Sequence, residues 1–384
     1  MTVPAGLDGT TYLDYNATTP VDPRVVAACL PYLARHFGNP SSGHAFGRVA
    51  RDAVESARGS VADLLDCAPD EVVFTGGGSE GDALAVHGAA LARRDRGDHV
   101  VTQATEHPAV LATCDSLARL HGFRVTRLPV DHHGLVDPAD LRGALTSRTV
   151  LVSIMHANNE TGTVQAVAEL AAIARAGGAL FHTDAAQSVG KIPVSVRDLG
   201  VDLLTVAGHK LYAPKGVGAL FVRHGVALEP LVHGGGQERG LRAGTENVPY
   251  LVALGVAARL AAEALPDEPE RLRRLRDGLH ADLDRRLPGR VHLNGHPGQR
   301  LPNTLNVSVD GVVASEVLAA LQGVAASAGS ACHEGAELPS PVLIAMGLTT
   351  GRATSALRLS LGRWTGERDV ERAADRVAAA VRSR

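Results

Sequence analysis

Aromatic residues and paired cysteines are the features this sequence has least of. Only 3% of its 384 residues are aromatic, so Ala, Val and Leu must fill most of the core. Its four cysteines show no CxxC spacing, which argues against a zinc site or a redox pair, and we expect no metal. Cys29, Cys67 and Cys114 lie in or beside apolar helical stretches, so we expect small buried hydrophobes there.

A charge excess and long apolar runs are also missing. The 38 Lys and Arg residues against 41 Asp and Glu give a formal charge of −3, without the basic excess of a nucleic-acid-binding protein. The arginines of residues 271–290 alternate with acids, which is typical of a solvated helix face. No apolar run reaches the ~18 residues of a membrane helix, and residues 1–11 lack the basic and apolar regions of a secretory signal. We therefore expect a cytoplasmic protein that binds neither nucleic acid nor membrane.

What is present is a regular alternation of strand-like and helix-like segments from about residue 70. We expect strands at 71–75, 99–102, 123–128, 150–154, 179–183, 203–206 and 217–222, and helices at 79–93, 108–121, 137–145 and 167–176. This alternation predicts an α/β fold with a mostly parallel sheet flanked by helices. Such sheets bind ligands beyond the carboxyl ends of their strands.

After residue 248 the pattern changes to that of a smaller α+β domain. We expect helices at 249–265, 315–321 and near 339–346, a strand at 304–309, and a last helix with Thr365 as its N-cap. Another helix carries a stripe of leucines from Leu272 to Leu283. We divide the chain into an N-terminal segment (1–16) that packs with the small domain, a large domain (17–253) and a small domain (254–384).

A lysine and a glycine-rich turn are the first candidates for a site. Lys210 ends Gly208-His209-Lys210 after a predicted strand, where it is placed to bond a carbonyl cofactor, although a lone lysine is more often a surface residue. Residues 75–80, TGGGSE, lie between a predicted strand and a helix, where backbone N–H groups and the helix dipole favour a phosphate. The GK[ST] ending of a P-loop and the GxGxxG spacing are both missing.

Two further strand ends carry polar side chains. Asp184 ends one predicted strand, where a carboxylate could hold the proton of a pyridine nitrogen. His107 stands at a strand–helix junction, where its ring could stack on an aromatic cofactor. Each alone is more often an N-cap or turn residue. Four such segments in the order phosphate loop, His, Asp, Lys favour one shared cofactor site.

With these motifs the chain resembles the cysteine desulfurases of the class V aminotransferase superfamily, including their selenocysteine lyase-like members. The resemblance runs through YLDYNATTP (12–20), GNPSS (38–42), HANNETG (156–162), GHK (208–210), GGGQER (234–239) and RLSLGR (358–363). It implies the type I fold of pyridoxal-phosphate (PLP) aminotransferases and a homodimer.

The resemblance also implies a role for each site residue. Lys210 would bind PLP covalently, Asp184 would pair with the pyridine nitrogen, and His107 would stack on the ring as a catalytic residue. Gln187 and Asn159 would bind the ring hydroxyl, Gly78, Ser79 and His209 the phosphate, Thr245 the phosphate of the other subunit, and Arg358 with Asn159 the substrate. The sequence departs from the common pattern at Ala207, where many relatives have a serine, and at Ser79, where threonine is commoner.

The remaining cysteine, Cys332, lies among small residues in AGSACHEG (328–335). By resemblance it is the catalytic nucleophile that takes sulfur from L-cysteine as a persulfide, releasing L-alanine, and passes it to a sulfur-acceptor protein. A neighbouring His333 could lower the pKa of its thiol. The acceptor stays open among an iron–sulfur scaffold, a tRNA-thiolation protein, a DNA-modification protein and a biosynthetic sulfur carrier.

Three other functions remain open at this point. A selenocysteine lyase shares this architecture, and Cys332-His333 and residues 236–239 resemble that enzyme as well. A class V aminotransferase is possible, but it has no use for a loop cysteine. A non-catalytic scaffold or sulfur-relay partner would not need Lys210, Asp184 and Cys332 together.

Overall fold

The central sheet of the large domain has seven strands, and one of them runs opposite to the others. The computed structural model describes residues 4, 7, 9–328 and 338–384. The strands, in spatial order, are β2 (Val72–Thr75), β8 (Gly218–Val222), β7 (Leu203–Ala207), β6 (Leu180–Asp184), β5 (Thr149–Ser153), β3 (His99–Gln103) and β4 (Arg124–Leu128). Strand β8 is antiparallel to both of its neighbours, and the other pairs are parallel. The predicted mostly parallel α/β sheet is confirmed.

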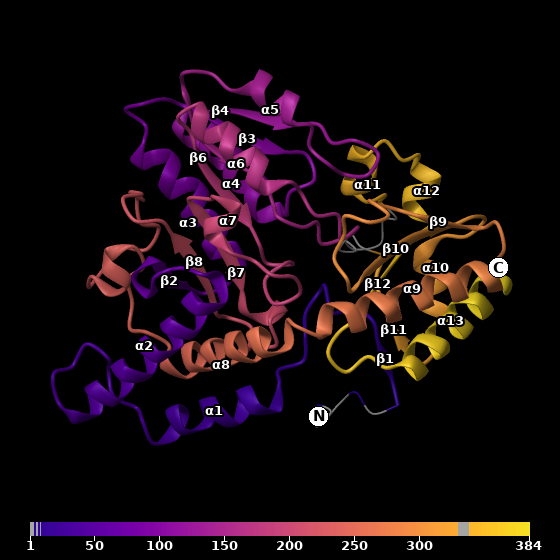
Figure 1. Cartoon of the computed structure of the whole chain (residues 1–384), viewed down its shortest axis with the longest axis horizontal. Helices are drawn as coiled ribbons and strands as arrows, with labels where there is room; N and C mark the ends of the chain where they lie inside the picture. Colours follow the sequence, from indigo (N-terminus) through magenta and orange to yellow (C-terminus); the bar gives the residue numbers. More distant parts are fainter. Residues whose placement is uncertain (1–3, 5–6, 8, 329–337) are drawn as a thin grey trace.

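Helices cover both faces of this sheet (Figure 1). They are α1 (Pro23–Ala34), α2 (Ala45–Leu65), α3 (Gly78–Ala92), α4 (Pro108–His121), α5 (Pro138–Ala144), α6 (Val167–Ala176), α7 (Val196–Leu199) and α8 (Val248–Ala264). Alternate strand residues enter opposite cores: Val72 and Phe74 pack with α1, α2, α6 and α8, whereas Val73 packs with α3 and α4. Every strand except β4 is buried along most of its length, as a doubly covered sheet requires.

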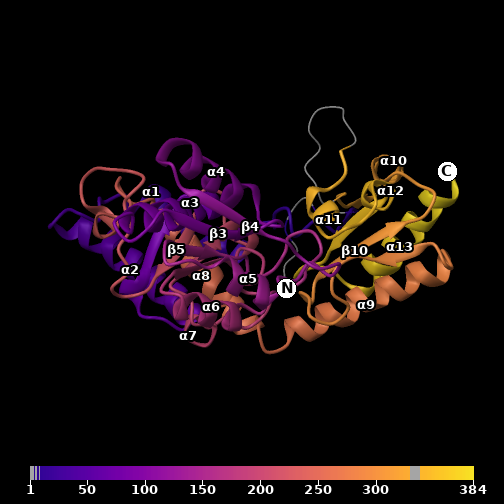
Figure 2. The same cartoon turned by 90° about the horizontal axis from the view of Figure 1, so that it is seen from above.

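The smaller part of the chain is built on a three-stranded antiparallel sheet, seen beside the large part in Figure 2. Its elements are α9 (Glu268–Arg286), β9 (Val291–Leu293), β10 (Thr304–Val309), α10 (Ala314–Ala320), β11 (Val324–Ala325), α11 (Pro341–Ala345), α12 (Thr350–Thr354), β12 (Ala356–Ser360) and α13 (Glu367–Arg382). Helices α9 and α13 pack together against one core. Strand β1 (Thr11–Tyr12) pairs with β11, and Leu13 is buried in the same core.

The division of the chain into domains stays a prediction. The expected boundary at residue 253 falls inside α8, whose residues as far as Ala261 belong to the core of the large sheet. Among the described residues, no single helix is long and apolar enough to cross a membrane. Helices α8 and α9 meet that test of length and composition only as a pair bent by 75°.

Thr365 is not the N-cap of the last helix, so this prediction is wrong. Helix α13 has Gly366 at its N-cap, and the Gly366 N–H donates to the Asp369 carboxylate at 3.0 Å. The Thr365 hydroxyl instead accepts a hydrogen bond from the Gly362 N–H at 3.0 Å. It closes the turn after β12 and lies two residues before Glu367, the first residue of the helix.

The cysteines follow the expectation for buried thiols where the structure describes them. Cys29 and Cys114 are buried in the two cores, and Cys67 is partly buried beside one of them. Burial raises the pKa of the Cys114 thiol to about 12. Cys114 is therefore a packing residue and not a nucleophile.

Candidate active site

One cavity of about 380 Å³ lies where several strands of the large sheet end. The turns after β2, β3, β5, β6 and β7 all contribute to its lining, because the carboxyl ends of parallel strands meet at one edge of a sheet. Eight of the predicted site residues line this cavity: Gly78, Ser79, His107, Asn159, Asp184, Gln187, His209 and Lys210.

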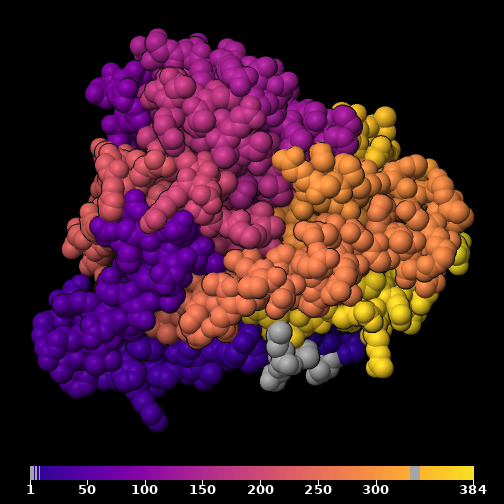
Figure 3. Space-filling view, viewed as in Figure 1, coloured from indigo at the N-terminus to yellow at the C-terminus, as the bar shows by residue number. Residues whose placement is uncertain are grey.

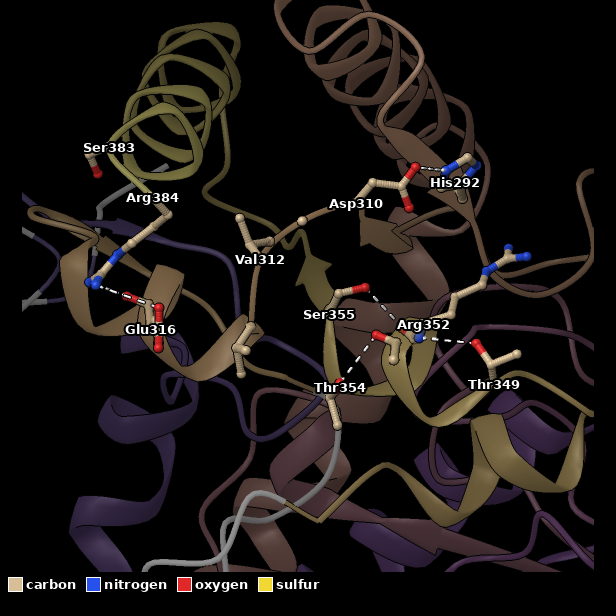
Figure 4. A pocket seen from close by; sticks show the side chains of 13 residues that line it. His292, Asp310, Val312, Glu316, Thr349, Arg352, Thr354, Ser355, Ser383 and Arg384 are labelled. Atoms are coloured by element: carbon tan, nitrogen blue, oxygen red, sulfur yellow. Dashed lines mark hydrogen bonds and ion pairs between the residues drawn. The ribbon is translucent and has the colours of Figure 1, made fainter.

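A larger cavity of about 920 Å³ lies in the smaller part of the chain. Figure 4 shows His292, Asp310 and Arg352 on its wall, with Glu316 and Arg384 on the opposite side. None of the predicted site residues lines it. The volume of a cavity therefore does not identify the site. The chemistry of the residues that line the cavity identifies it.

The glycine-rich turn forms an anion cradle at the start of α3. Gly77 has φ +146°, which L side chains rarely adopt, and a Cβ on Gly78 would lie 3.1 Å from the Cβ of Ala207. The first N–H groups of a helix have no partner within the helix, and here they face the cavity. The Gly76 N–H donates to the Glu80 carboxylate at 2.9 Å, and Glu80 pairs with Arg242 at 2.9 Å. The turn is thus fixed in shape and open to a phosphate.

Lys210 lines the same cavity and ends the short helix Gly208–Lys210 that follows β7. Its Nζ donates to the backbone carbonyl of Asn16. Burial and the nearby Arg358 lower the pKa of the Lys210 amine to about 8. An amine with this pKa is half deprotonated at about pH 8, so a substantial fraction of Lys210 is the free amine that a nucleophile or base must be.

Three carboxyl groups gather beneath the cavity. The Asp184 carboxylate accepts a hydrogen bond from the Ala186 N–H at 2.8 Å. Burial raises the pKa of Asp184, while His107 and Lys210 act in the opposite direction. Burial and the charge of Asp184 raise the pKa values of Asp82 and Glu106 well above normal. Of the three carboxyl groups, Asp184 is the one whose pKa is also lowered by the nearby Lys210 amine.

Asp82 and Glu106 were missed by the sequence analysis. Asp82 lines the cavity one turn into α3, and Glu106 accepts a hydrogen bond from the Met155 N–H at 2.6 Å. Glu106 directly precedes His107, and Asp82 lies two residues beyond the glycine-rich segment 75–80. An acid within two or three residues of a cofactor motif is the signal that could have found them.

His107 combines a structural and a site role. Its Nδ1 accepts a hydrogen bond from the Ala109 N–H at 3.2 Å, which makes it the N-cap of α4. Burial lowers the pKa of His107, and because Nδ1 accepts a hydrogen bond, the neutral form of the ring carries its proton on Nε2. The cap fixes the ring in the cavity wall.

Both ends of the Gln187 side-chain amide form hydrogen bonds. Its Nε2 donates to the Asn16 carbonyl at 3.0 Å, and its Oε1 accepts from Lys191 Nζ at 2.7 Å. Lys191 and Asn16 were not among the predicted site residues. Lys191 follows Gln187 by four residues, which is the only signal in the sequence that links the two.

Arg358 does not line the cavity but lies next to it. Its guanidinium donates to the Asp14 carboxylate at 2.9 Å and to the Asn159 carbonyl at 3.1 Å. Its Nε is buried and has no hydrogen-bond partner among the residues that the structure describes. A carboxylate ligand would thus compete with Asp14 for a buried cation.

Two predicted site residues remain, Thr245 and Cys332. Thr245 is exposed and does not line the cavity of its own chain. Cys332, with its neighbour His333, lies outside the described residues. Their assigned roles stay predictions.

The donor set fits pyridoxal phosphate. A cavity of about 380 Å³ falls in the size range of small-ligand sites. The glycine cradle suits a phosphate, the buried Asp184 suits a ring nitrogen that carries a proton, and Lys210 supplies an amine for a carbonyl. Ala207 contributes a methyl group to the cradle where a hydroxyl would add one more donor.

Comparison with known proteins identifies the family of this chain. The family described as Aminotransferase class-V matches residues 11–373. A protein of Methanosarcina thermophila named cysteine desulfurase IscS is 47% identical over 363 residues, which cover 94% of this chain and 89% of that protein. A solved structure titled NifS-like protein is 36% identical with a TM-score of 0.91, covering 98% of this chain and 100% of that one. Another, titled SspA in complex with cysteine, is 37% identical with a TM-score of 0.81 and covers 91% and 98%.

A mostly parallel α/β sheet with a lysine, a carboxylate and a phosphate cradle at one edge defines an enzyme that anchors a phosphorylated carbonyl cofactor. The chain belongs to the aminotransferase class-V family and is a homologue of the cysteine desulfurases. Enzymes of this family use PLP. The family that the sequence resembles and the predicted fold class are both confirmed.

Proposed function

We propose that this protein is a PLP-dependent cysteine desulfurase that transfers sulfur from L-cysteine to Cys332. The observation that carries the proposal is the convergence of Lys210, Asp184 and the N-terminus of α3 on one cavity. The similarity to cysteine desulfurases over 94% of the chain supports the choice of reaction.

PLP would be held by residues of this chain at each of its functional groups. Lys210 would bind its carbonyl carbon, Asp184 its ring nitrogen, and Gly78 and Ser79 its phosphate. His107 would lie against the ring. When bound, PLP supplies an electron-withdrawing ring that weakens the bonds of an attached amino acid.

The chemistry then divides among three side chains. Arg358 binds the substrate carboxylate, a task that suits a guanidinium with N–H groups in a planar fork. Lys210 Nζ accepts the proton from Cα, because its lowered pKa leaves the amine free. Sγ of Cys332 attacks the substrate sulfur, so an S–S bond forms as the Cβ–S bond breaks. The carbon fragment takes up a proton, and L-cysteine plus a thiol thus gives L-alanine plus a persulfide.

One experiment tests this proposal directly. Purified protein loaded with PLP is given L-cysteine without a reductant, and alanine and the mass of the peptide containing Cys332 are measured. We expect alanine in a one-to-one ratio to a peptide heavier by one sulfur atom. Cys332→Ala should keep the PLP absorbance and release no sulfide on addition of a reductant. Normal sulfide release from Cys332→Ala would contradict the mechanism.

Selenocysteine lyase is the second candidate, because residues 236–239 and Cys332-His333 resemble that enzyme as well. The two activities differ in the atom released. Comparing kcat/KM for L-selenocysteine and L-cysteine, with Cys332→Ala beside wild type, separates them. Selenide release that survives Cys332→Ala while cysteine turnover is lost would favour the lyase.

A homodimer in the cytoplasm is the form we propose for the active enzyme. An apolar patch on α1, the segment after it and the first turn of α2 supports it: Leu30, Leu33, Phe37 and Phe46 are 54–73% exposed. The rings of Phe37 and Phe46 stack at 5.5 Å on this patch. Exposed apolar side chains that gather in one place are typical of a protein interface. In Figure 3 this N-terminal region, in indigo, forms one corner of the molecule. The sulfur acceptor would be a separate protein.

A further inference from the structure

The side chain that orients Gln187 is a second partly buried lysine, Lys191. It stands in the turn after β6, two residues after Val189 and directly after Gly190. Gly190 has φ +75°, and a Cβ there would lie 2.2 Å from Cδ1 of Leu211. Only glycine fits this position, and the tight turn sends Lys191 back toward Gln187.

Both hydrogen bonds of Lys191 are made to amide oxygens. Nζ donates to Gln187 Oε1 at 2.7 Å and to Asn16 Oδ1 at 3.2 Å. The assignment of oxygen and nitrogen in the two amides follows from their other partners. Gln187 Nε2 faces the Asn16 carbonyl and Asn16 Nδ2 faces the Asn159 carbonyl, and a carbonyl can only accept.

The orientation of Gln187 has a consequence for the cavity that it lines. One N–H of its Nε2 donates to the Asn16 carbonyl, which leaves the second N–H free to donate to a ligand. Because Oε1 is turned away toward Lys191, Gln187 presents a donor to the cavity and not an acceptor. A donor is what a deprotonated ring oxygen needs.

Asn16 joins this pair to the rest of the site. Its Oδ1 also accepts from Asn303 Nδ2 at 3.0 Å, and its Nδ2 donates to Thr304 Oγ1 at 2.9 Å. Its carbonyl accepts from Lys210 as well as from Gln187. Lys191 therefore holds the side chain of a residue that contacts Lys210 through its backbone carbonyl and strand β10 through its side-chain amide.

The positions of the lysines in this chain also support a role for Lys191 at the site. Of the 38 Lys and Arg residues, three are lysines, at positions 191, 210 and 215. Lys210 and Lys215 line the cavity, and Lys191 contacts Gln187 on its wall. The chain uses arginine for its surface cations. A lysine at position 191 is therefore better explained by the limited space and the two oxygen acceptors there than by a need for positive charge.

We infer that Lys191 is a positioning residue for the cofactor: it fixes the Gln187 amide so that an N–H donor faces the ring oxygen of PLP. This inference rests on the proposed function, since it assumes that PLP occupies the cavity. Burial, together with Lys210 and Arg358, lowers the pKa of Lys191 well below its ordinary value. The two hydrogen bonds need two N–H donors, which a neutral amine still has.

A double-mutant cycle on PLP binding tests the inference. Apo forms of wild type, Lys191→Met, Gln187→Leu and the double variant are titrated with PLP, and the Kd is measured. Because Lys191→Met leaves the oxygen of Gln187 without its partner, we expect about tenfold weaker binding for this variant. Gln187→Leu removes the donor and should weaken binding to a similar extent.

The double variant decides whether Lys191 acts through Gln187. We expect it to bind PLP about as well as Gln187→Leu alone, whereas independent effects would multiply to about 100-fold. The visible band of bound PLP gives a second readout. In Lys191→Met its pH-dependent change should move to higher pH, because the deprotonated ring oxygen loses a fixed donor.

Two results would overturn the inference: a Kd for Lys191→Met equal to that of wild type, or effects that multiply in the double variant. If Lys191→Met does not fold, Lys191→Ala, which also removes the N–H donors, is taken through the same cycle under the same criteria. A wild-type protein that binds no PLP would instead refute the proposed function.

Discussion

At the scale of single residues, the environment of each ionisable side chain decides its use. Lys210, Asp184 and His107 all lie in the same buried region, yet their pKa values move for different reasons. Burial lowers the pKa values of the Lys210 amine and the His107 ring and raises that of Asp184. The neighbouring charges then separate their roles: Asp184 gains cationic partners and Lys210 gains a cationic neighbour in Arg358.

The pKa of Lys210 should therefore respond to its two charged neighbours with opposite signs. In the apo protein the amine should become reactive with a midpoint of about pH 8. Arg358→Gln removes a cation and should move the midpoint up, whereas Asp184→Asn removes an anion and should move it down. The measurement is the pH dependence of amine labelling at Lys210, read by mass spectrometry of its peptide. Shifts of the same sign in both variants would contradict this account.

A second residue-scale prediction concerns His156, a buried ring that does not line the cavity. Burial lowers its pKa to about 4, and its Nδ1 lies 2.9 Å from Ser188 Oγ. Since the folded pKa lies below the unfolded value, the unfolded state binds the proton first as the pH falls. His156 therefore costs stability between about pH 6.5 and pH 4, by about 3 kcal/mol over that interval.

Removing this ring should remove that pH dependence. Relative to wild type, His156→Asn should gain about 3 kcal/mol in unfolding free energy as the pH falls from about 6.5 to 4, whatever its offset at neutral pH. Urea unfolding of both proteins at several pH values gives the difference. A difference that stays constant with pH would show that His156 is not neutral in the folded protein.

At the scale of elements, the phosphate cradle depends on backbone shape more than on side chains. Gly77 has φ +146° with open space around its Cα, so Gly77→Ala meets no clash but strains the backbone. We expect a loss of about 1–3 kcal/mol in stability and weaker PLP binding. Gly59 in α2 also has open space but lies inside a helix. Gly59→Ala should gain about 0.5–1 kcal/mol and leave PLP affinity unchanged. Thermal unfolding and PLP titration of both variants check the contrast.

The elements themselves could be predicted from the sequence because their periodicity is strong. Helix α4 and strand β10 begin and end where the pattern predicts, and the reversed strand β8 is the feature that the alternation does not reveal. Site residues at strand ends were also predictable, since parallel strands bring their carboxyl ends together. Lys191 and Asn16 were not, because the contact between them joins positions 175 residues apart.

At the scale of the whole molecule, the site gathers parts that lie far apart in the chain. Asn16, near the N-terminus, contacts Lys210 and Gln187 of the large sheet and Thr304 of the small one. Arg358 reaches Asp14 across 344 residues. The cavity is therefore complete only when the N-terminal segment is docked between the two sheets, and cofactor binding should stabilise the whole fold.

The last prediction joins the apolar patch to the predicted role of Thr245. If a second copy covers Leu33 and Phe37, the double variant Leu33→Glu, Phe37→Glu should be monomeric in sedimentation, because burying two carboxylates is unfavourable. Leu120→Glu, on an exposed leucine of α4 on the opposite face of the sheet, is the matched control and should stay dimeric.

If Thr245 of the other copy contacts the phosphate, Thr245→Val should weaken PLP binding by about 1 kcal/mol in the dimer. It should have no further effect in the monomeric variant, whose site already lacks that contact. Equal effects of Thr245→Val in both backgrounds would mean that Thr245 acts within its own chain.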